Sequence, residues 1–196
     1  MNAPIVPKVR MKVDEFLAWS DSQSEGRYEL VDGQIVAMAP DRVLHNLTKL
    51  SVAVALRDAV NAAALPCTVF TDGVAVVINE STTRIPDASV QCEAPLDRAS
   101  MVVSPLIVVE VASPSSERSD LGAKLIEYFS LPGVRHYLVV LADKRAVVHY
   151  RRHESGEIET HILHEGADVI LAPPGMNVRV SALLGPELPA EGSEDD

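Results

Sequence analysis

A glutamate inside an apolar run is the feature that most constrains the fold of this chain. The run LIVVEVAS places Glu110 directly after four apolar residues, 106–109. A nearly continuous apolar segment of this kind predicts a strand that is covered on both faces of a sheet. A carboxylate buried there without a partner is costly, or its pKa shifts until it is neutral. Glu110 therefore needs a compensating positive group from outside its own strand. That group is either a bound divalent cation or a lysine from another part of the chain.

A second acid, Asp87, is expected on a neighbouring strand. It lies in the sequence Arg84-Ile85-Pro86-Asp87, where Pro86 is expected to begin a strand. Neighbouring strands lie about 4.8 Å apart, so carboxylates at the same level of two strands can share one metal ion. A site made of oxygen ligands suits Mg²⁺, or Mn²⁺, rather than zinc. A turn or capping carboxylate beside Pro86 is the structural alternative for Asp87.

Lys124 is the third candidate, on a helix expected at 119–131. It falls on the apolar stripe of that helix, which should pack against the sheet. Its long side chain could reach the two acids, where it could orient or deprotonate an attacking water or neutralise charge on a phosphate. Two alternatives stay open: a structural Glu110–Lys124 ion pair and an ordinary surface lysine. The stripe consists of Leu121, Leu125, Tyr128 and Phe129.

The remaining pattern predicts a mixed α/β (α+β) fold, with a sheet flanked by helices and an N-terminal helix and hairpin. The hairpin, 27–31 with 34–38, turns at Asp32-Gly33, which suits the positive φ of a type I′ turn. Helices are expected at 12–20 and at 42–64, the latter with an apolar stripe of Leu44, Leu47, Ser51, Val54 and Ala55. Strands are expected at 67–70 and 74–78, joined near Asp72-Gly73, and at 86–92, 106–111, 136–141, 146–151, 157–163, 169–171 and 177–180.

The length of 196 residues fits one domain, expected at 12–184 between a flexible arm (1–11) and an acidic disordered tail (185–196). No apolar run is long enough for a membrane span, and the N-terminus lacks the apolar core of a secretory signal. A cytoplasmic protein is expected, with Cys67 and Cys92 as two reduced structural thiols. The net charge of −11 argues against a protein that coats DNA by bulk attraction. A cation-binding acid cluster would contribute to the same sum.

A strand aspartate written Pro-Asp, an acid on the next strand and a nearby lysine resemble the PD-(D/E)XK nuclease superfamily. More narrowly, residues 12–184 look like the Uma-two family of proposed restriction endonucleases, formerly a domain of unknown function. The segments that carry this resemblance are Tyr28-Glu29-Leu30-Val31-Asp32-Gly33, His45, Pro86-Asp87, Val109-Glu110-Val111-Ala112-Ser113-Pro114, Lys124 with Tyr128, and Gly133-Val134 ahead of His136-Tyr137.

The resemblance implies a restriction-endonuclease-like fold and further site residues. The main-chain carbonyl of Val111 would join the metal shell, and Glu29 and His45 would belong to the site. The alternatives are a solvent-facing hairpin residue for Glu29 and a capping or core histidine for His45. The lysine that the superfamily has two residues after the acid is replaced here by Ala112. Its role is assigned to Lys124.

Two other groups of residues have surface explanations. His149, His153, His161 and His164 suggest zinc, but a solvated hairpin explains them better because no cysteine joins them. The basic pairs Lys144-Arg145 and Arg151-Arg152 could contact phosphates, although such pairs are common near turns. Ser113 fits a turn at a strand end better than a supporting role in the site.

The sequence thus predicts a metal-dependent endonuclease that cleaves nucleic acid, preferably DNA, with a homodimer as a plausible assembly. Asp87 and Glu110 would bind Mg²⁺ or Mn²⁺, and Lys124 would help to orient water. Glu29 would tune the site or hold a second ion. Two rivals stay open: a catalytically silent nuclease-fold binding or regulatory module, and a metal-dependent hydrolase of another substrate.

Overall fold

A computed structural model of the chain describes residues 10–92, 102–113 and 116–187. Most of the expected arm and tail therefore lies outside the described residues. The helices are α1 (Val13–Asp21), α2 (Val43–Ala62), α3 (Glu117–Asp120), α4 (Ala123–Ser130) and α5 (Val180–Leu183), with a 3₁₀ turn η1 (Ala142–Lys144). The strands are β1 (Tyr28–Val31), β2 (Gln34–Ala37), β3 (Cys67–Thr71), β4 (Val76–Asn79), β5 (Thr82–Arg84), β6 (Ala88–Cys92), β7 (Ile107–Val111), β8 (His136–Leu141), β9 (Ala146–Arg152), β10 (Ile158–His164), β11 (Asp168–Leu171) and β12 (Met176–Arg179).

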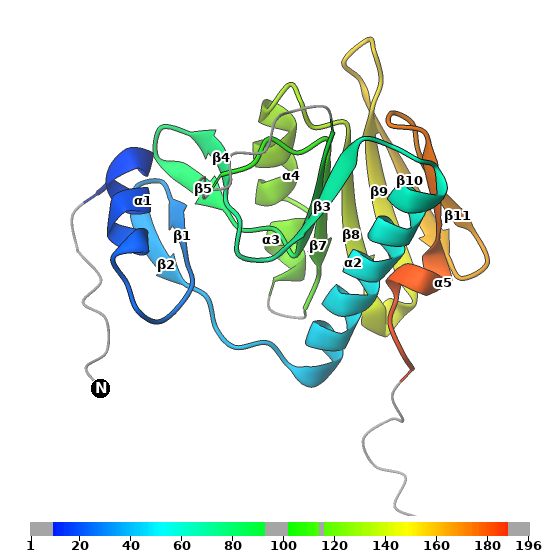
Figure 1. The fold of residues 1–196 in the computed structure, drawn as a ribbon, viewed down its shortest axis with the longest axis horizontal. Helices are drawn as coiled ribbons and strands as arrows, with labels where there is room; N and C mark the ends of the chain where they lie inside the picture. The colour runs from blue at the N-terminus through cyan, green and yellow to red at the C-terminus, as the bar shows by residue number, and fades with distance from the viewer. Residues whose placement is uncertain (1–9, 93–101, 114–115, 188–196) are drawn as a thin grey trace, which may run out of the picture.

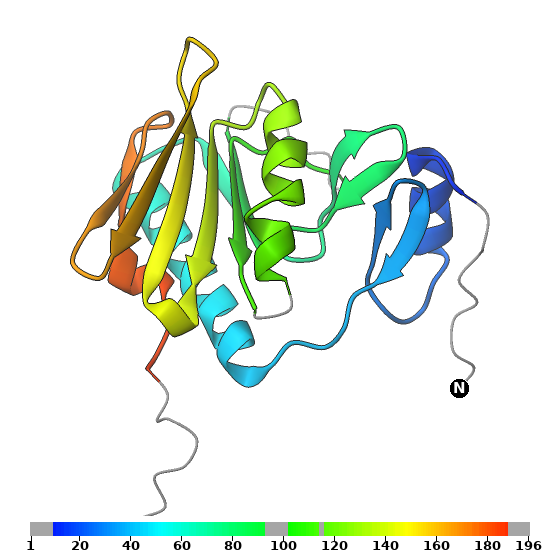
Figure 2. The same cartoon turned by 180° about the vertical axis from the view of Figure 1, so that it is seen from behind.

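The central layer is a six-stranded sheet with the order β10-β9-β8-β7-β6-β3. Only β7 and β8 run parallel, while the other neighbours are antiparallel, so the sheet is mixed as expected. Helix α2 covers one face together with α5 and the β11–β12 pair, and α4 covers the other face (Figures 1 and 2). A smaller sheet, β2-β1-β5-β4, lies beside this body and packs on α1.

Strand β7 runs through the centre of the sheet, and all five of its residues are buried. Its alternation divides the strand between the two faces. Ile107, Val109 and Val111 join the core beneath α2, whereas Val108 joins the core beneath α4. Glu110 shares the face of Val108 and therefore points toward α4. The predicted doubly covered strand is confirmed.

The predicted apolar stripe of the long helix is displaced from the buried face, because Leu44, Leu47, Ser51 and Ala55 are only half-buried. Val54 of that stripe is 36% exposed, and Leu50 of the same helix is 61% exposed. The buried residues of α2 are instead Thr48, Lys49, Val52, Leu56 and Val60, spaced as one side of a helix, and the half-buried His45 lies one turn before Lys49. The predicted stripe therefore missed the helix face that carries His45 and Lys49 near its N-terminal end.

Three other expectations are corrected. The helix expected at 119–131 is split at Gly122, whose ψ of −89° breaks the helical path and where a Cβ would lie 2.9 Å from the Arg118 carbonyl oxygen. The segments 67–70 and 74–78 do not pair with each other, because β3 joins β6 and β4 joins β5. Residues 180–183 form α5, and β5 was not expected. The Asp32-Gly33 turn is confirmed, with φ values of 49° and 78°.

The expectation of two reduced thiols is also corrected. Cys67 and Cys92 form a disulfide. They are direct register partners across the antiparallel β3–β6 pair, so the fold brings together residues that stand 25 positions apart. The bond ties the edge strand β3 to β6, the strand that follows Asp87. Within the described residues, no helix combines the length and apolar character needed to cross a membrane.

Candidate active site

Asp87 lies in a bend one residue before β6, not inside the predicted strand. The β6–β7 register, in which Ala88 faces Val109, places Asp87 at the level of Glu110 when it is extended by one residue. Asp87 is 6% exposed, and its Oδ2 accepts a 2.7 Å hydrogen bond from the backbone N–H of Val111. The bend frees the Asp87 side chain from the alternation of the strand and fixes it against the end of β7.

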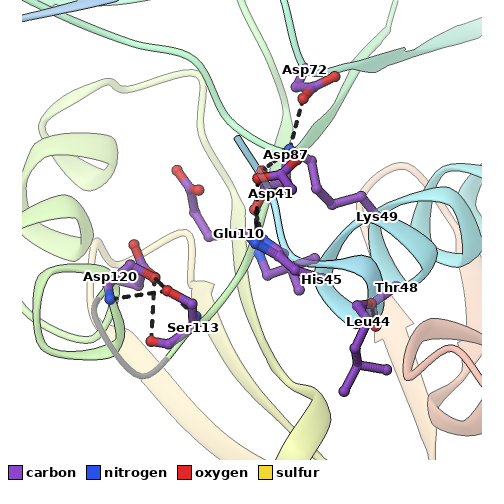
Figure 3. Close-up of polar contacts among 12 residues, drawn as sticks. Asp41, Leu44, His45, Thr48, Lys49, Asp72, Asp87, Glu110, Ser113 and Asp120 are labelled. Carbon is purple, nitrogen blue, oxygen red and sulfur yellow. Dashed lines mark hydrogen bonds and ion pairs between the residues drawn. The ribbon is translucent and has the colours of Figure 1, made fainter. Parts of the chain in front are cut away.

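The carboxylate of Asp87 is compensated by Lys49 of α2. Lys49 Nζ lies 2.9 Å from Asp87 Oδ1, 2.8 Å from Asp41 Oδ2 and 2.7 Å from Asp72 Oδ2. Arg27 also pairs with Asp72. Burial alone would raise the pKa of Asp87, but His45, Lys49 and the Val111 N–H together hold it below its ordinary value. Figure 3 shows Asp41, His45, Lys49 and Asp72 gathered around Asp87.

His45 stands beside Asp87, one helical turn before Lys49. Its Nε2 lies 3.5 Å from Asp87 Oδ2 and its Nδ1 lies 3.5 Å from Asp41 Oδ1. These distances are too long for strong hydrogen bonds, so we treat both contacts as electrostatic. Asp87 is the main reason that the pKa of His45 is raised. Among the described residues, His45 Nε2 is buried without a hydrogen-bond partner, so this ring nitrogen is available within the site.

Glu110 is 3% exposed and receives its partners from the chain segment after β7, as predicted. Tyr128 of α4 donates a 2.7 Å hydrogen bond to Glu110 Oε1, and Lys124 Nζ lies 3.0 Å from the same oxygen. Lys124 also contacts Asp120 Oδ1 at 3.1 Å. Burial raises the pKa of Glu110 to about 8, and the charges of Asp87 and Asp120 add to this rise against Lys124 and Tyr128. Glu110 is thus incompletely compensated even with a lysine beside it.

Lys124 remains a charged group in this environment. Burial alone would lower its pKa, but the charges of Glu110, Asp120 and Glu29 outweigh burial and raise it. An ammonium with a raised pKa is a poor proton acceptor near neutral pH. Of the three roles predicted for Lys124, orientation of water and charge neutralisation fit this geometry better than deprotonation of water.

Glu29 lies on β1 and is 8% exposed, so it is not a solvent-facing hairpin residue. Its Oε2 pairs with Arg84 Nη1 at 2.9 Å, and its Oε1 accepts a 2.9 Å hydrogen bond from the backbone N–H of Ile85. Arg84 also binds Glu127 of α4. Glu29 is close enough to affect the pKa of Lys124, but it is held by Arg84 rather than by Asp87 or Glu110.

Most of the chain matches one known protein family. The profile of the Uma2 family, described as "Putative restriction endonuclease", matches residues 13–184. The chain belongs to the Uma2 family. A relative in Synechocystis, the uncharacterized protein slr1290, is 28% identical over 159 residues, which cover 80% of this chain and 82% of the relative.

A solved structure shares the Uma2 fold of this chain. The crystal structure of a "putative nuclease belonging to DUF820" from Anabaena variabilis superposes with a TM-score of 0.71, at 17% identity. The superposition covers 89% of this chain and 97% of that one. The fold is therefore that of the nuclease-like proteins, a mixed sheet flanked by helices.

The donor set of this Uma2 site suits a hard divalent cation. Asp87 and Glu110 would offer carboxylate oxygens and Val111 its carbonyl, the ligand type that Mg²⁺ prefers. Asp87 and Glu110 are near enough that the charge of one raises the pKa of the other. Within the described ranges, however, no group of three or more His, Cys, Asp or Glu side chains is arranged to hold a metal ion. The two acids are turned toward separate lysines, so metal binding would require their side chains to reorient.

Several site residues were not singled out from the sequence as members of the site. Lys49, Asp41 and Asp72 surround Asp87, and Asp120 stands beside Lys124. Lys49 had a visible signal, because it follows His45 by four residues and precedes the buried Val52 and Leu56 on one helix face. The aspartates come from a loop before α2, the β3–β4 turn and α3. Ser113 forms the turn after β7 with Ser116, as expected.

The remaining histidines differ from the expectation in one case. His149 is 3% exposed and is not part of a solvated hairpin, whereas His153, His161 and His164 are partly or fully exposed. His149 Nε2 lies 2.9 Å from His136 Nδ1, and His136 Nε2 lies 2.7 Å from the Pro173 carbonyl oxygen. Burial chiefly lowers the pKa of His136 to about 4 and that of His149 to about 3.

Proposed function

We propose that this protein is a metal-dependent endonuclease that hydrolyses phosphodiester bonds of DNA. The observation that carries the proposal is the position of Asp87 and Glu110 at one level of adjacent strands, each beside a lysine from a flanking helix. Membership in a family described as restriction endonucleases supports the reaction class. Metal ion and substrate are the parts that experiments must test.

Each residue of the site has a distinct part in the proposal. Asp87 and Glu110, with the carbonyl of Val111, would hold Mg²⁺ or Mn²⁺. Such an ion supplies a Lewis acid for the phosphate and lowers the pKa of a water molecule. Lys124 would hold water or a phosphate oxygen through its N–H groups and stabilise negative charge. These parts follow from position and charge.

Four residues would support the site rather than react. Lys49 fixes the orientation of Asp87, and Tyr128 fixes that of Glu110. His45 faces Asp87, and its Nε2, which has no hydrogen bond among the described residues, could donate one to a phosphate oxygen. Glu29 would contribute negative potential near Lys124 rather than a direct metal ligand, because it is held by Arg84 and the Ile85 N–H and not beside Asp87 or Glu110.

The test is cleavage of supercoiled and linear DNA with Mg²⁺ or Mn²⁺, and in EDTA. We expect cleavage by the parent only with metal, and at least a hundredfold loss, roughly 3 kcal/mol in the activation barrier, in Asp87→Asn and Glu110→Gln. Asp58→Asn is the matched control, since Asp58 lies exposed on α2 and pairs only with Arg57 among the described residues. Undiminished cleavage by Asp87→Asn would rule the proposal out.

A second candidate is a nuclease-fold module that binds without cleaving. Its supporting observation is that both acids already have lysine partners, together with a net charge of −11. Calorimetry with Mn²⁺ separates the two candidates. Heat of binding that disappears in Glu110→Gln supports the enzyme, and its absence from the parent supports the silent module. Parallel assays with RNA and with nucleotides would reveal a hydrolase of another substrate.

A further inference from the structure

A cavity with a basic lining lies at the end of the six-stranded sheet, away from Glu110. Its volume is about 480 Å³. The lining comes from the start of β8, the end of β9 with the turn that follows, and the β11–β12 turn. Because Glu110 pairs with Val139, Arg135 lies four residues, roughly 13 Å, before the level of Glu110 along β8. The β9–β10 turn projects from the end of the sheet opposite to α3 (Figures 1 and 2).

Three arginines line this cavity. Arg152 N donates a 2.9 Å hydrogen bond to the Arg135 carbonyl oxygen, and Arg151 is the register partner of His136. Among the described residues, none of the three has an acidic partner, and the Nε of each is buried without a hydrogen bond. Five other arginines among the described residues pair with acids, namely Arg27, Arg57, Arg84, Arg145 and Arg179.

Within the described ranges, these three arginines have no acidic ion-pair partner, although acids are abundant in a chain of net charge −11. Glu154 and Glu157 lie in the exposed turn at the rim of the cavity. Glu159, the cross-strand neighbour of Arg151, is instead 3.0 Å from both His153 and His161. After burial, the charges of Arg151 and Arg135 contribute to the low pKa of His136. The three arginines of the cavity therefore have no ion-pair partner in the part of the chain that the structure describes, although two glutamates stand at its rim.

We propose that this cavity binds a phosphate group. The planar guanidinium groups of arginines match phosphate oxygens with paired hydrogen bonds. Arg152 is already positioned, because it donates to the Phe129 carbonyl oxygen and stands 5.2 Å from the centre of the Phe129 ring. The phosphate could be a free anion or part of a nucleic-acid backbone. The site does not depend on the proposed nuclease activity, because it shares no residue with the Asp87–Glu110 site.

The other basic pair of the sequence does not form a comparable site. Lys144 pairs with Glu117, and Arg145 pairs with Glu165. Their charge is neutralised within the chain, which leaves less capacity for an external anion. Of the two basic pairs, only Arg151-Arg152 lines a cavity with a third arginine beside it.

The test is titration of the full chain with inorganic phosphate, by calorimetry and by NMR of arginine side chains at constant ionic strength. The test variant is Arg135→Gln with Arg151→Gln, which spares the Phe129 contact of Arg152. We expect saturable binding by the parent and affinity weakened about 10-fold or more in the variant. Arg57→Gln, a single charge removed from the surface of α2, should bind as the parent does. Absence of saturable binding in the parent, or equal affinity in the variant, would overturn the proposal.

Two further measurements distinguish the source of the phosphate and guard against misfolding. A labelled oligonucleotide, titrated in EDTA, should also bind more weakly to the variant if the cavity takes backbone phosphate, and equally well if it takes free phosphate. Thermal unfolding will report whether the double variant is folded. If it is not, Arg135→Lys with Arg151→Lys keeps both charges and should retain phosphate binding, whereas the single Arg135→Gln should weaken it.

Discussion

Lys49 and Lys124 solve the same physical problem on opposite faces of one sheet. Each is an ammonium on a helix that packs against the six-stranded sheet, and each lies about 3 Å from a buried carboxylate. Lys49 serves three aspartates with short contacts, whereas Lys124 serves Glu110 and Asp120. Removing one member of such a group leaves the others buried without compensation, which costs far more than the pair itself contributes.

Replacement of Lys49 by methionine should therefore destabilise the protein strongly. We expect the free energy of unfolding to fall by roughly 3 kcal/mol, since Asp87 and Asp41 would lose their closest cation. Urea denaturation followed by circular dichroism measures this change. Lys12→Met is the control, because Lys12 makes only an exposed 3.9 Å pair with Glu80, and it should cost less than about 1 kcal/mol. Equal effects of the two changes would contradict a structural role for Lys49.

At the scale of elements, the buried histidines of β8 and β9 predict a dependence of stability on pH. His136 and His149 have pKa values of about 4 and about 3, lowered chiefly by burial. In the unfolded chain both would titrate near their ordinary value, so between that value and pH 4 the unfolded state binds protons that the folded state does not. The free energy of unfolding must then fall as the pH is lowered through this interval.

Replacing His149 by glutamine should make this loss shallower, by up to about 1.4 kcal/mol per pH unit between roughly pH 6 and pH 4. Denaturation series at several pH values provide the measurement. The groups facing His149 are His136, His161, Arg151 and Glu159, all of which the variant retains. His164→Gln changes an exposed histidine of β10 and should leave the slope as in the parent. A His149→Gln slope identical to that of the parent would show that the pair stays protonated on folding.

The disulfide between β3 and β6 gives a second prediction for the elements. It closes a loop between residues 25 positions apart, and such a crosslink stabilises a protein by about 3 kcal/mol through the unfolded state. Reduction with dithiothreitol should lower the free energy of unfolding by about this amount. The Cys67→Ala, Cys92→Ala double variant should match the reduced protein and be insensitive to the reductant. Identical stability with and without reductant in the parent would show that the bond contributes nothing.

Elements with strong local signals could be predicted from the sequence, and partners set by tertiary pairing could not. The buried strand β7 and the Asp32-Gly33 turn are determined by residues that are neighbours in the sequence, and both predictions are confirmed. The pairing of β3 with β6 depends on contacts distant in sequence, so neither that pairing nor the disulfide was visible. Lys124 was found because a lysine interrupts an apolar stripe. Lys49 was missed because the stripe was drawn through Leu44, Leu47 and Val54, whereas the buried face runs through Lys49, Val52 and Leu56.

At the scale of the whole molecule, charge is the property that sets association with nucleic acid. The chain carries 28 aspartates and glutamates against 17 lysines and arginines, which gives a net charge of −11. Four of these acids, Glu191, Glu194, Asp195 and Asp196, belong to the last nine residues. A negative chain repels a polyanion at long range, so the approach of DNA, the substrate proposed above, would depend on local positive groups and on the ionic strength.

Removal of residues 188–196 changes the net charge from −11 to −7 and should strengthen binding to DNA at low salt. The reason is long-range repulsion, which salt screens to a range of roughly 3 Å at 1 M, so parent and truncated chain should converge there. Fluorescence anisotropy of a labelled duplex in EDTA measures binding without cleavage. A full-length variant with the four tail acids replaced by their amides should behave like the truncated chain, because it removes charge but not length. If the amide variant instead binds like the parent while the truncation binds more tightly, the tail acts by occupying space near the DNA and not by charge.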